Sequence, residues 1–206
     1  MRENNHTFNE MEAVALERLK GMDPKEISQK TTIPFDEESS AFYLNSLGID
    51  VTIHYPAYTI EPYLPDWHHL ILLHHLEMAQ GVGISKNNIS FRELPDGFVR
   101  GEQFDKLCET IVARTIGNFE LKGLTDACLA MGAKIQESRA DLSAEFSFAP
   151  LYPVTLNLWL AEEDELPGSG KMLLDSNAAK QLSTEDAVTI GELILETIKT
   201  KYKEKS

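Results

Sequence analysis

Cysteine is scarce in this sequence. The 206 residues include only two cysteines, Cys108 and Cys128, and they do not form a Cys-x-x-Cys pair. An iron–sulfur cluster and a structural zinc site each take about four ligands, so two distant cysteines exclude the common cysteine-based forms of both. We interpret the two as small buried side chains of helices in a reducing compartment.

Long apolar runs and basic residues are also few. The longest aliphatic run, Leu70–Leu73, is far shorter than the roughly 20 residues that span a bilayer, and the polar N-terminus has no apolar signal-peptide region. With 33 acidic and 19 basic residues, the formal net charge is −14. Such a surface repels nucleic acids and anionic membranes. We therefore predict a cytoplasmic protein that neither binds nucleic acid nor inserts into a membrane.

The motifs of the commonest enzyme classes are missing as well. The sequence contains no G-x-S-x-G, H-E-x-x-H, P-loop or G-x-G-x-x-G pattern. The catalytic residues, if there are any, stay unknown, and the absence favours a protein that is not an enzyme.

What the sequence does contain predicts an α+β fold in one globular domain over residues 1–206, with residues 1–7 and 203–206 as frayed tails. Helical periodicity predicts helices at residues 8–22, 24–33, 67–80, 103–116, 121–131 and from 183 onward. Alternation predicts strands at 41–45, 49–54 and 89–92, and a hairpin at 144–160. Because strands are grouped between helices without regular alternation, we expect antiparallel hairpins packed with N-terminal, central and C-terminal helices.

Local signals give the ends and faces of several elements. Asp23 is placed to cap a helix with Pro24 at its first position, and Ser183 with Asp186 resembles a capping box. The first helix has an apolar stripe that includes Met11 and Val14.

The stretch PDWHHLILLHHLEMAQG, residues 65–81, holds four of the six histidines. With Asp66 as N-cap, a helical wheel puts His68 and His75 near the centre of the apolar arc and His69 and His74 toward its polar side. The arc is formed by Trp67, Ile71, Leu72, Leu76, Met78 and Ala79. His68 and His75 are seven residues apart, about 10.5 Å of helical rise, and no pair has the i, i+3 or i, i+4 spacing of a metal site. The helix alone therefore does not bind a metal ion.

Two interpretations of these histidines stay open. His75 is either a hydrogen-bonded core residue or a cofactor ligand or proton carrier with a tunable pKa. His68 lies in the first helical turn, where we expect shallower burial. His69 and His74 are expected to be the more solvated members of their pairs.

Other candidates carry similar alternatives. Arg92 and Glu93, where a strand enters a turn, either pair with each other or hold a polar ligand. Trp159, on the face opposite the leucines of its strand, either packs under a helix or lines a binding surface. Asp175, at the end of an apolar run, is either a functional carboxylate or a turn residue.

Five segments of the chain match the recurring motifs of one known family: ALERLKGMDPKEIS, LLHHLEMAQGVGI, ISFRELPDG, LNLWLAEEDELP and LLDSNAAKQLSTEDAVTIGELI. Over roughly residues 14–200 the sequence resembles the family called domain of unknown function 3786. The resemblance implies that the family's motifs include His74, Ser90, Phe91, Arg92, Glu93, Gly97, Trp159 and Asp175. It also implies that an aromatic residue is common at the position of His75, which favours His74 as the functional histidine.

The resemblance carries no established activity. It implies an origin among anaerobic bacteria and archaea and a loose association with corrinoid-dependent methyl metabolism. Some relatives carry a cysteine-rich iron–sulfur segment that this chain lacks.

Three functions follow as hypotheses. The first is a cofactor- or ligand-binding accessory protein of anaerobic metabolism, whose ligand-binding residues are His74, His75, Ser90, Arg92, Glu93, Trp159 and Asp175. A tetrapyrrole such as a corrinoid or haem is its candidate cofactor, with His74 or His75 as axial ligand and Trp159 as a stacking wall. The second is a small-substrate enzyme that uses Arg92, Glu93, His74 and Asp175. The third is a protein-interaction module whose contact is the acidic loop at Glu162–Glu165.

Overall fold

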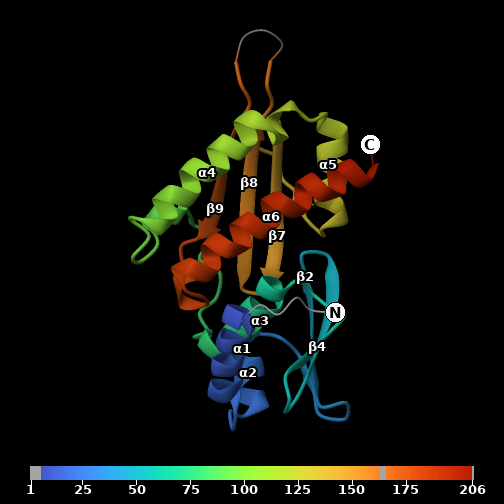
Figure 1. Ribbon diagram of the computed structural model, residues 1–206, viewed down its shortest axis with the longest axis vertical. Helices are drawn as coiled ribbons and strands as arrows, with labels where there is room; N and C mark the ends of the chain where they lie inside the picture. Colours follow the sequence, from blue (N-terminus) through green and yellow to red (C-terminus); the bar gives the residue numbers. More distant parts are fainter. Residues whose placement is uncertain (1–5, 163–165, 206) are drawn as a thin grey trace.

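The computed structural model describes residues 6–162 and 166–205, and these form six α-helices and two antiparallel sheets (Figure 1). The predicted α+β class is confirmed. None of the helices in these two ranges is long and apolar enough to cross a membrane. Of the predicted acidic loop, residues 163–165 lie outside the described residues.

The first sheet belongs to the N-terminal part of the chain. Its strands are β1 (Phe35–Asp36), β2 (Ala41–Ser46), β3 (Ile49–His54) and β4 (Thr59–Glu61), and they pair in that order. The predicted β2–β3 hairpin turns at Leu47 and Gly48, both with positive φ, as a two-residue turn of right-handed twist requires. Val51 and Ile53 are buried on one face, as their alternation predicts.

The second sheet forms the centre of the C-terminal part. Its strands are β5 (Asn88–Ile89), β6 (Lys134–Ile135), β7 (Leu142–Ala149), β8 (Tyr152–Trp159) and β9 (Ser169–Asp175), in the order β5-β9-β8-β7-β6. The predicted hairpin is β7–β8, and its inward side chains are fully buried. They are Phe146, Phe148, Val154, Leu156 and Leu158.

The helices divide between the two parts. They are α1 (His6–Leu19), α2 (Pro24–Thr31), α3 (Asp66–Met78), α4 (Arg100–Arg114), α5 (Leu121–Ala130) and α6 (Thr184–Lys205), with short 3-10 helices η1 (Phe91–Glu93), η2 (Ile116–Asn118) and η3 (Ala178–Lys180). Helices α4 and α6 cross one face of the second sheet, whereas α1 and α2 lie with the first sheet at the other end of the molecule (Figure 1). Helix α3 lies between the two parts and contacts both α1 and α6.

Several predicted helix ends are confirmed. Asp23 caps α2, where its carboxylate accepts the N–H of Lys25 at 2.9 Å, and Pro24 is the first helical residue. Ser183 and Asp186 form the capping box of α6. The predicted apolar stripe of α6 is buried, from Ala187 through Ile198.

Other expectations were wrong. Helix α3 begins at Asp66 itself, with Pro65 at the N-cap position and no side-chain cap. Met11 and Val14 are 40% and 50% exposed, because α1 turns Phe8 and Leu19 toward the core instead. The predicted strand at 89–92 ends at Ile89, since Ser90 caps the turn of η1 that follows.

Candidate functional site

The histidine helix α3 places each of its four imidazoles in a different environment. His68 is 2% exposed, its Nε2 lies 2.8 Å from the hydroxyl of Ser46 on β2, and its ring packs on Phe148 of β7. Burial, with a smaller contribution from His69, lowers the pKa of His68 to about 4. His68 is therefore neutral and joins the two sheets, and the shallow burial expected for it was wrong.

His69 is also buried, contrary to the wheel. It is 6% exposed, its Nε2 lies 2.9 Å from Glu12 of α1, and its ring meets the ring of Phe8 edge to face. The polar side of α3 is covered because α1 packs over it, and Glu12 supplies the polar partner that a buried imidazole needs. Trp67 and Met78, assigned to the apolar arc, are instead 42% and 38% exposed.

His75 is enclosed by the core. It is 0% exposed, and neither ring nitrogen has a hydrogen-bond partner among the described residues. Burial lowers the pKa of His75 to about 4, so the ring is neutral. Because its ring meets only protein atoms, an external ligand does not reach it in this arrangement.

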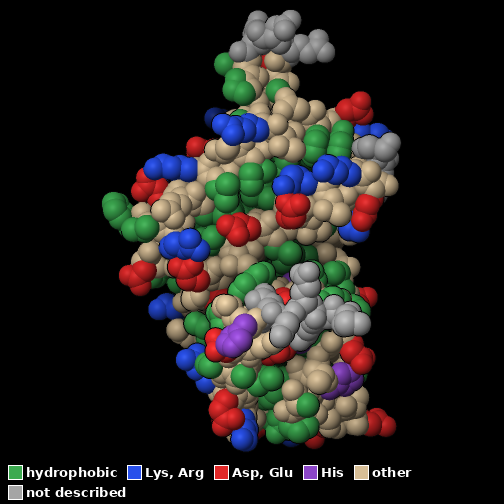
Figure 2. Space-filling view, viewed as in Figure 1, with side chains coloured by type: hydrophobic (Ala, Val, Ile, Leu, Met, Phe, Trp, Pro, Cys, Tyr) green, Lys and Arg blue, Asp and Glu red, His purple; other side chains and the backbone are tan. Residues whose placement is uncertain are grey.

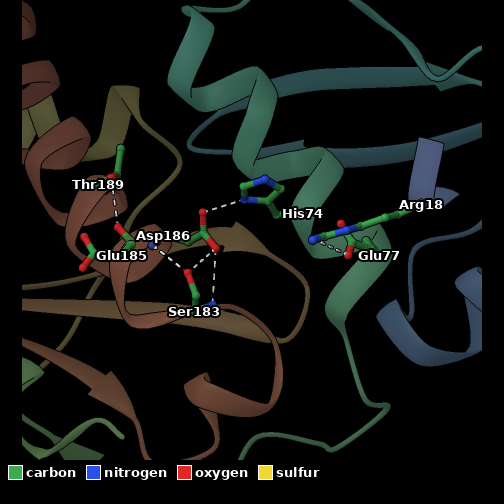
Figure 3. Close-up of polar contacts among 7 residues, drawn as sticks. All are labelled: Arg18, His74, Glu77, Ser183, Glu185, Asp186 and Thr189. Atoms are coloured by element: carbon green, nitrogen blue, oxygen red, sulfur yellow. Dashed lines mark hydrogen bonds and ion pairs between the residues drawn. The ribbon is translucent and has the colours of Figure 1, made fainter. Parts of the chain in front are cut away.

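His74 is the histidine that combines a partner with partial exposure. Its Nδ1 lies 2.7 Å from Oδ1 of Asp186, the third residue of α6 (Figure 3). The other carboxylate oxygen, Oδ2, accepts the Ser183 hydroxyl at 2.6 Å. The side chains of His74 and Asp186 are 15% and 9% exposed. Nε2 of His74 has no partner in the part of the chain that the structure describes.

We call Ser183, Asp186 and His74 the polar array, and the direction of the hydrogen bonds among them decides its chemistry. The serine hydroxyl donates to the carboxylate and not to the imidazole, so Ser183 is not activated as a nucleophile, unlike the serine of a catalytic triad. Because an ionised carboxylate only accepts hydrogen bonds, Nδ1–H of His74 donates to Asp186, and in the neutral ring the lone pair then lies on Nε2. A carboxylate behind an imidazole is the usual support of a metal-ligating histidine or of a histidine that accepts a proton.

A groove runs beside this array, where α6 faces α3. One cavity of about 460 Å³ is lined by Met11, Trp67, Leu70, Ile71, Arg100, Glu185, Asp186, Thr189 and Glu192. A more apolar cavity of about 380 Å³ adjoins it, lined by Pro65, Trp67, Ile111, Thr189, Glu192, Leu193, Leu195 and Glu196. We call these two cavities the seam groove, because hydrophobic side chains lie exposed along the line where the two parts of the molecule meet (Figure 2). Trp67 belongs to both cavities.

Ser90, Arg92 and Glu93 lie together where η1 contacts α4 and β9. Glu93 does not pair with Arg92. Its Oε2 instead accepts the N–H and the hydroxyl of Ser90 at 2.7 and 2.6 Å, which completes the capping box of η1. Ser90 and Arg92 line a cavity of about 160 Å³ with Asp105, Glu109, Gly170, Lys171 and Met172.

Asp175 and Trp159 line neither the seam groove nor the cavity at Ser90 and Arg92. Asp175 is 3% exposed and accepts the N–H groups of Ser85, Lys86 and Asn177. Burial alone would raise the pKa of Asp175, but these donors lower it, so the residue stabilises a turn as an ionised carboxylate. Trp159 is 39% exposed at the far end of β8 from Tyr152, about 24 Å along the strand.

The partners that define the His74 site and the cavity at Ser90 and Arg92 follow from no sequence pattern. Asp186 lies 112 residues from His74 and was interpreted only as a capping residue. Asp105 and Lys171 were not singled out, because neither belongs to a recognisable motif. No spacing rule connects positions so distant along the chain.

The described residues offer little evidence for a metal-binding site or for a reactive cysteine. No group of three or more histidine, cysteine, aspartate or glutamate residues there is arranged to hold a metal ion. Burial raises the pKa of both Cys108 and Cys128 to about 12, so both are neutral thiols, as their predicted burial implies.

Comparison with known proteins gives a family and no activity. Neither a curated protein nor a solved structure matches the chain. The family described as Domain of unknown function (DUF3786) matches residues 23–197, which include His74, Asp186 and the Ser90–Glu93 turn. The chain belongs to this family.

Proposed function

We propose that the protein is a ligand-binding accessory protein in which His74 contacts the ligand. The observation that carries the proposal is the imidazole held through Nδ1 by Asp186, on a side chain that is 15% exposed and whose Nε2 has no partner among the described residues. Among the four histidines of α3, His68 and His69 bond to other elements and His75 is enclosed.

The seam groove supports a ligand with an apolar body. Asp186 lines the groove and also holds His74, so the polar array lies at its margin. Trp67, 42% exposed, lines both cavities and offers an aromatic wall, whereas Trp159 lines neither. Volumes of about 380 and 460 Å³ are in the range of small-molecule sites.

A tetrapyrrole such as a corrinoid or haem is the proposed ligand class. Its metal takes an axial imidazole, and a histidine backed by a carboxylate is the donor that second-shell chemistry favours. His74 fits this role, and His75 does not, because its ring is 0% exposed.

The test is a spectroscopic titration of the purified full-length chain with haem and with hydroxocobalamin under anaerobic conditions. We expect one of them to show an absorption shift on binding that His74→Ala abolishes. Asp186→Asn, which removes the carboxylate charge, should weaken binding about 10- to 100-fold. His54→Ala is the matched control, because His54 is a half-exposed imidazole on β3. The absence of any shift, or a shift unchanged in His74→Ala, contradicts the tetrapyrrole proposal.

A further inference from the structure

The small cavity at Ser90 and Arg92 brings charges of both signs together without pairing them. The two basic residues that line it are Arg92 of η1 and Lys171 of β9. The two acidic residues, Asp105 and Glu109, both belong to α4. Within the described ranges, none of these four side chains forms an ion pair. Several other lysines and arginines do pair with carboxylates, for example Lys106 with Glu102 at 2.6 Å.

The four charges are nevertheless close to one another. Burial raises the pKa of Asp105, while the Arg92 N–H and the positive charges of Arg92 and Lys171 act in the opposite direction. Lys171 also contributes to the lowered pKa of Glu93, which the Ser90 hydroxyl mainly causes. Arg92 and Lys171 thus act on Asp105 across a cavity of about 160 Å³, which is several times the roughly 30 Å³ that one water molecule occupies.

The backbone holds this arrangement firmly. A Cβ on Gly101 would lie 2.1 Å from the carbonyl oxygen of Phe91, so only glycine lets the start of α4 approach η1 this closely. One turn later, the carboxylate of Asp105 accepts the N–H groups of Phe91 and Arg92 at 3.3 and 3.2 Å. The positions of Asp105 and Arg92 are therefore coupled before any ligand arrives, which is the preorganisation that a binding site needs.

We propose that this cavity binds a small zwitterion of the free α-amino acid class, with the ligand carboxylate at Arg92 and Lys171 and its ammonium group at Asp105 and Glu109. A simple anion would meet two carboxylates, and a simple cation would meet two basic side chains. A molecule with both charges a few ångströms apart complements both pairs, and a guanidinium binds a carboxylate through two parallel hydrogen bonds. The Ser90 hydroxyl, 3% exposed, adds a polar group to the wall.

The test is calorimetric titration of the full-length protein with glycine, L-alanine, L-serine and L-aspartate, and with propionate, propylamine and inorganic phosphate as single-charge probes. We expect at least one amino acid to bind at least tenfold more tightly than every single-charge probe. Arg92→Gln and Lys171→Gln should each weaken that binding tenfold or more. Both residues are exposed, so the variants should keep the wild-type circular dichroism spectrum.

Lys134→Gln is the matched control, since Lys134 is an exposed lysine on β6 at the opposite edge of the same sheet. Failure of all four amino acids to bind overturns the proposal, and so does equal binding of propionate, propylamine or phosphate. Unchanged affinity in folded Arg92→Gln and Lys171→Gln also overturns it. His74→Ala should leave this binding intact, so the result is independent of the tetrapyrrole titration.

Discussion

At the scale of the residue, four imidazoles on one helix differ because each faces another element. His68 and His75 are buried and neutral, while the side chain of His74 is 15% exposed. The two members of each doublet are the same type of residue and are adjacent in the sequence. The environment that the fold supplies, not the residue type, makes only His74 a candidate ligand contact.

The lowered pKa values of His68 and His75 predict that the protein is less stable in mild acid than at neutral pH. Their folded pKa values of about 4 lie below the ordinary value of 6.5, so the unfolded chain binds protons more readily as the pH falls. Their contribution to stability is complete above pH 6.5 and is lost progressively between pH 6.5 and 4. Urea denaturation should give a free energy of unfolding about 2 kcal/mol lower at pH 5 than at pH 7.5 for each histidine. Equal stability at the two pH values would contradict this.

His75→Leu separates one of these contributions from the rest. The leucine removes two ring nitrogens that have no partner among the described residues, and it removes one titrating group. The variant should be at least as stable as the wild type at pH 7.5 and lose about 2 kcal/mol less on acidification to pH 5. Parallel urea titrations of both proteins measure the difference. An identical pH dependence would show that His75 does not titrate on unfolding.

At the scale of the element, Asp186 connects helix formation to the candidate site. It closes the capping box of α6 with Ser183 and, through its other oxygen, holds His74 of α3. The first turn of α6 and the orientation of His74 are therefore coupled, which neither contact alone would achieve.

Two substitutions distinguish the cap from the link to α3. Ser183→Ala removes the cap hydroxyl and should lower the free energy of unfolding by about 1 kcal/mol. Asp186→Ala also leaves His74 without its partner and should cost about 2 to 3 kcal/mol. Chemical denaturation of the two variants and of His74→Ala checks this, with the double variant His74→Ala/Asp186→Ala completing the cycle. Strictly additive losses for His74 and Asp186 would refute the coupling.

Sequence patterns predicted the helices and strands better than they predicted which of these elements pack against each other. Alternation in β3 and in the β7–β8 hairpin, and the stripe of α6, needed only neighbouring positions and are confirmed. The wheel of α3 failed at His69, because a wheel assumes one buried side and α3 is covered by both α1 and the C-terminal part. Alternation predicted a strand over residues 89–92, but the strand ends at Ile89 because Ser90 begins the capping box of η1.

At the scale of the whole molecule, the two parts meet through close backbone contacts. The β2–β3 turn reaches the end of α5, where a Cβ on Gly48 would lie 2.7 Å from the carbonyl carbon of Met131. Leu47 donates its N–H to Ser147 of β7 at 2.9 Å, and His68 hydrogen-bonds Ser46 beside this contact. The first sheet therefore supports both α3 and the C-terminal part.

Gly48→Ala should weaken this contact strongly. Gly48 has a φ of 81°, which favours glycine, and the added methyl group would meet backbone atoms that cannot move aside cheaply. We expect a loss of about 2 kcal/mol or more in the free energy of unfolding, measured by thermal or urea denaturation. Gly83→Ala is the control, because a Cβ there meets nothing within 4 Å. Equal stability of the two variants would refute the importance of this contact.

The sequence by itself determined the fold class, the buried faces of β3, of the β7–β8 hairpin and of α6, and the absence of the familiar catalytic motifs. These follow from composition and from periodicities that extend over a few neighbouring residues. Only the tertiary structure decided that His74 faces Asp186, that His69 faces Glu12, and that Arg92 and Lys171 meet Asp105 and Glu109 across one cavity. Such partners lie on elements far apart along the chain, and their meeting depends on how whole elements pack, which local periodicity does not encode.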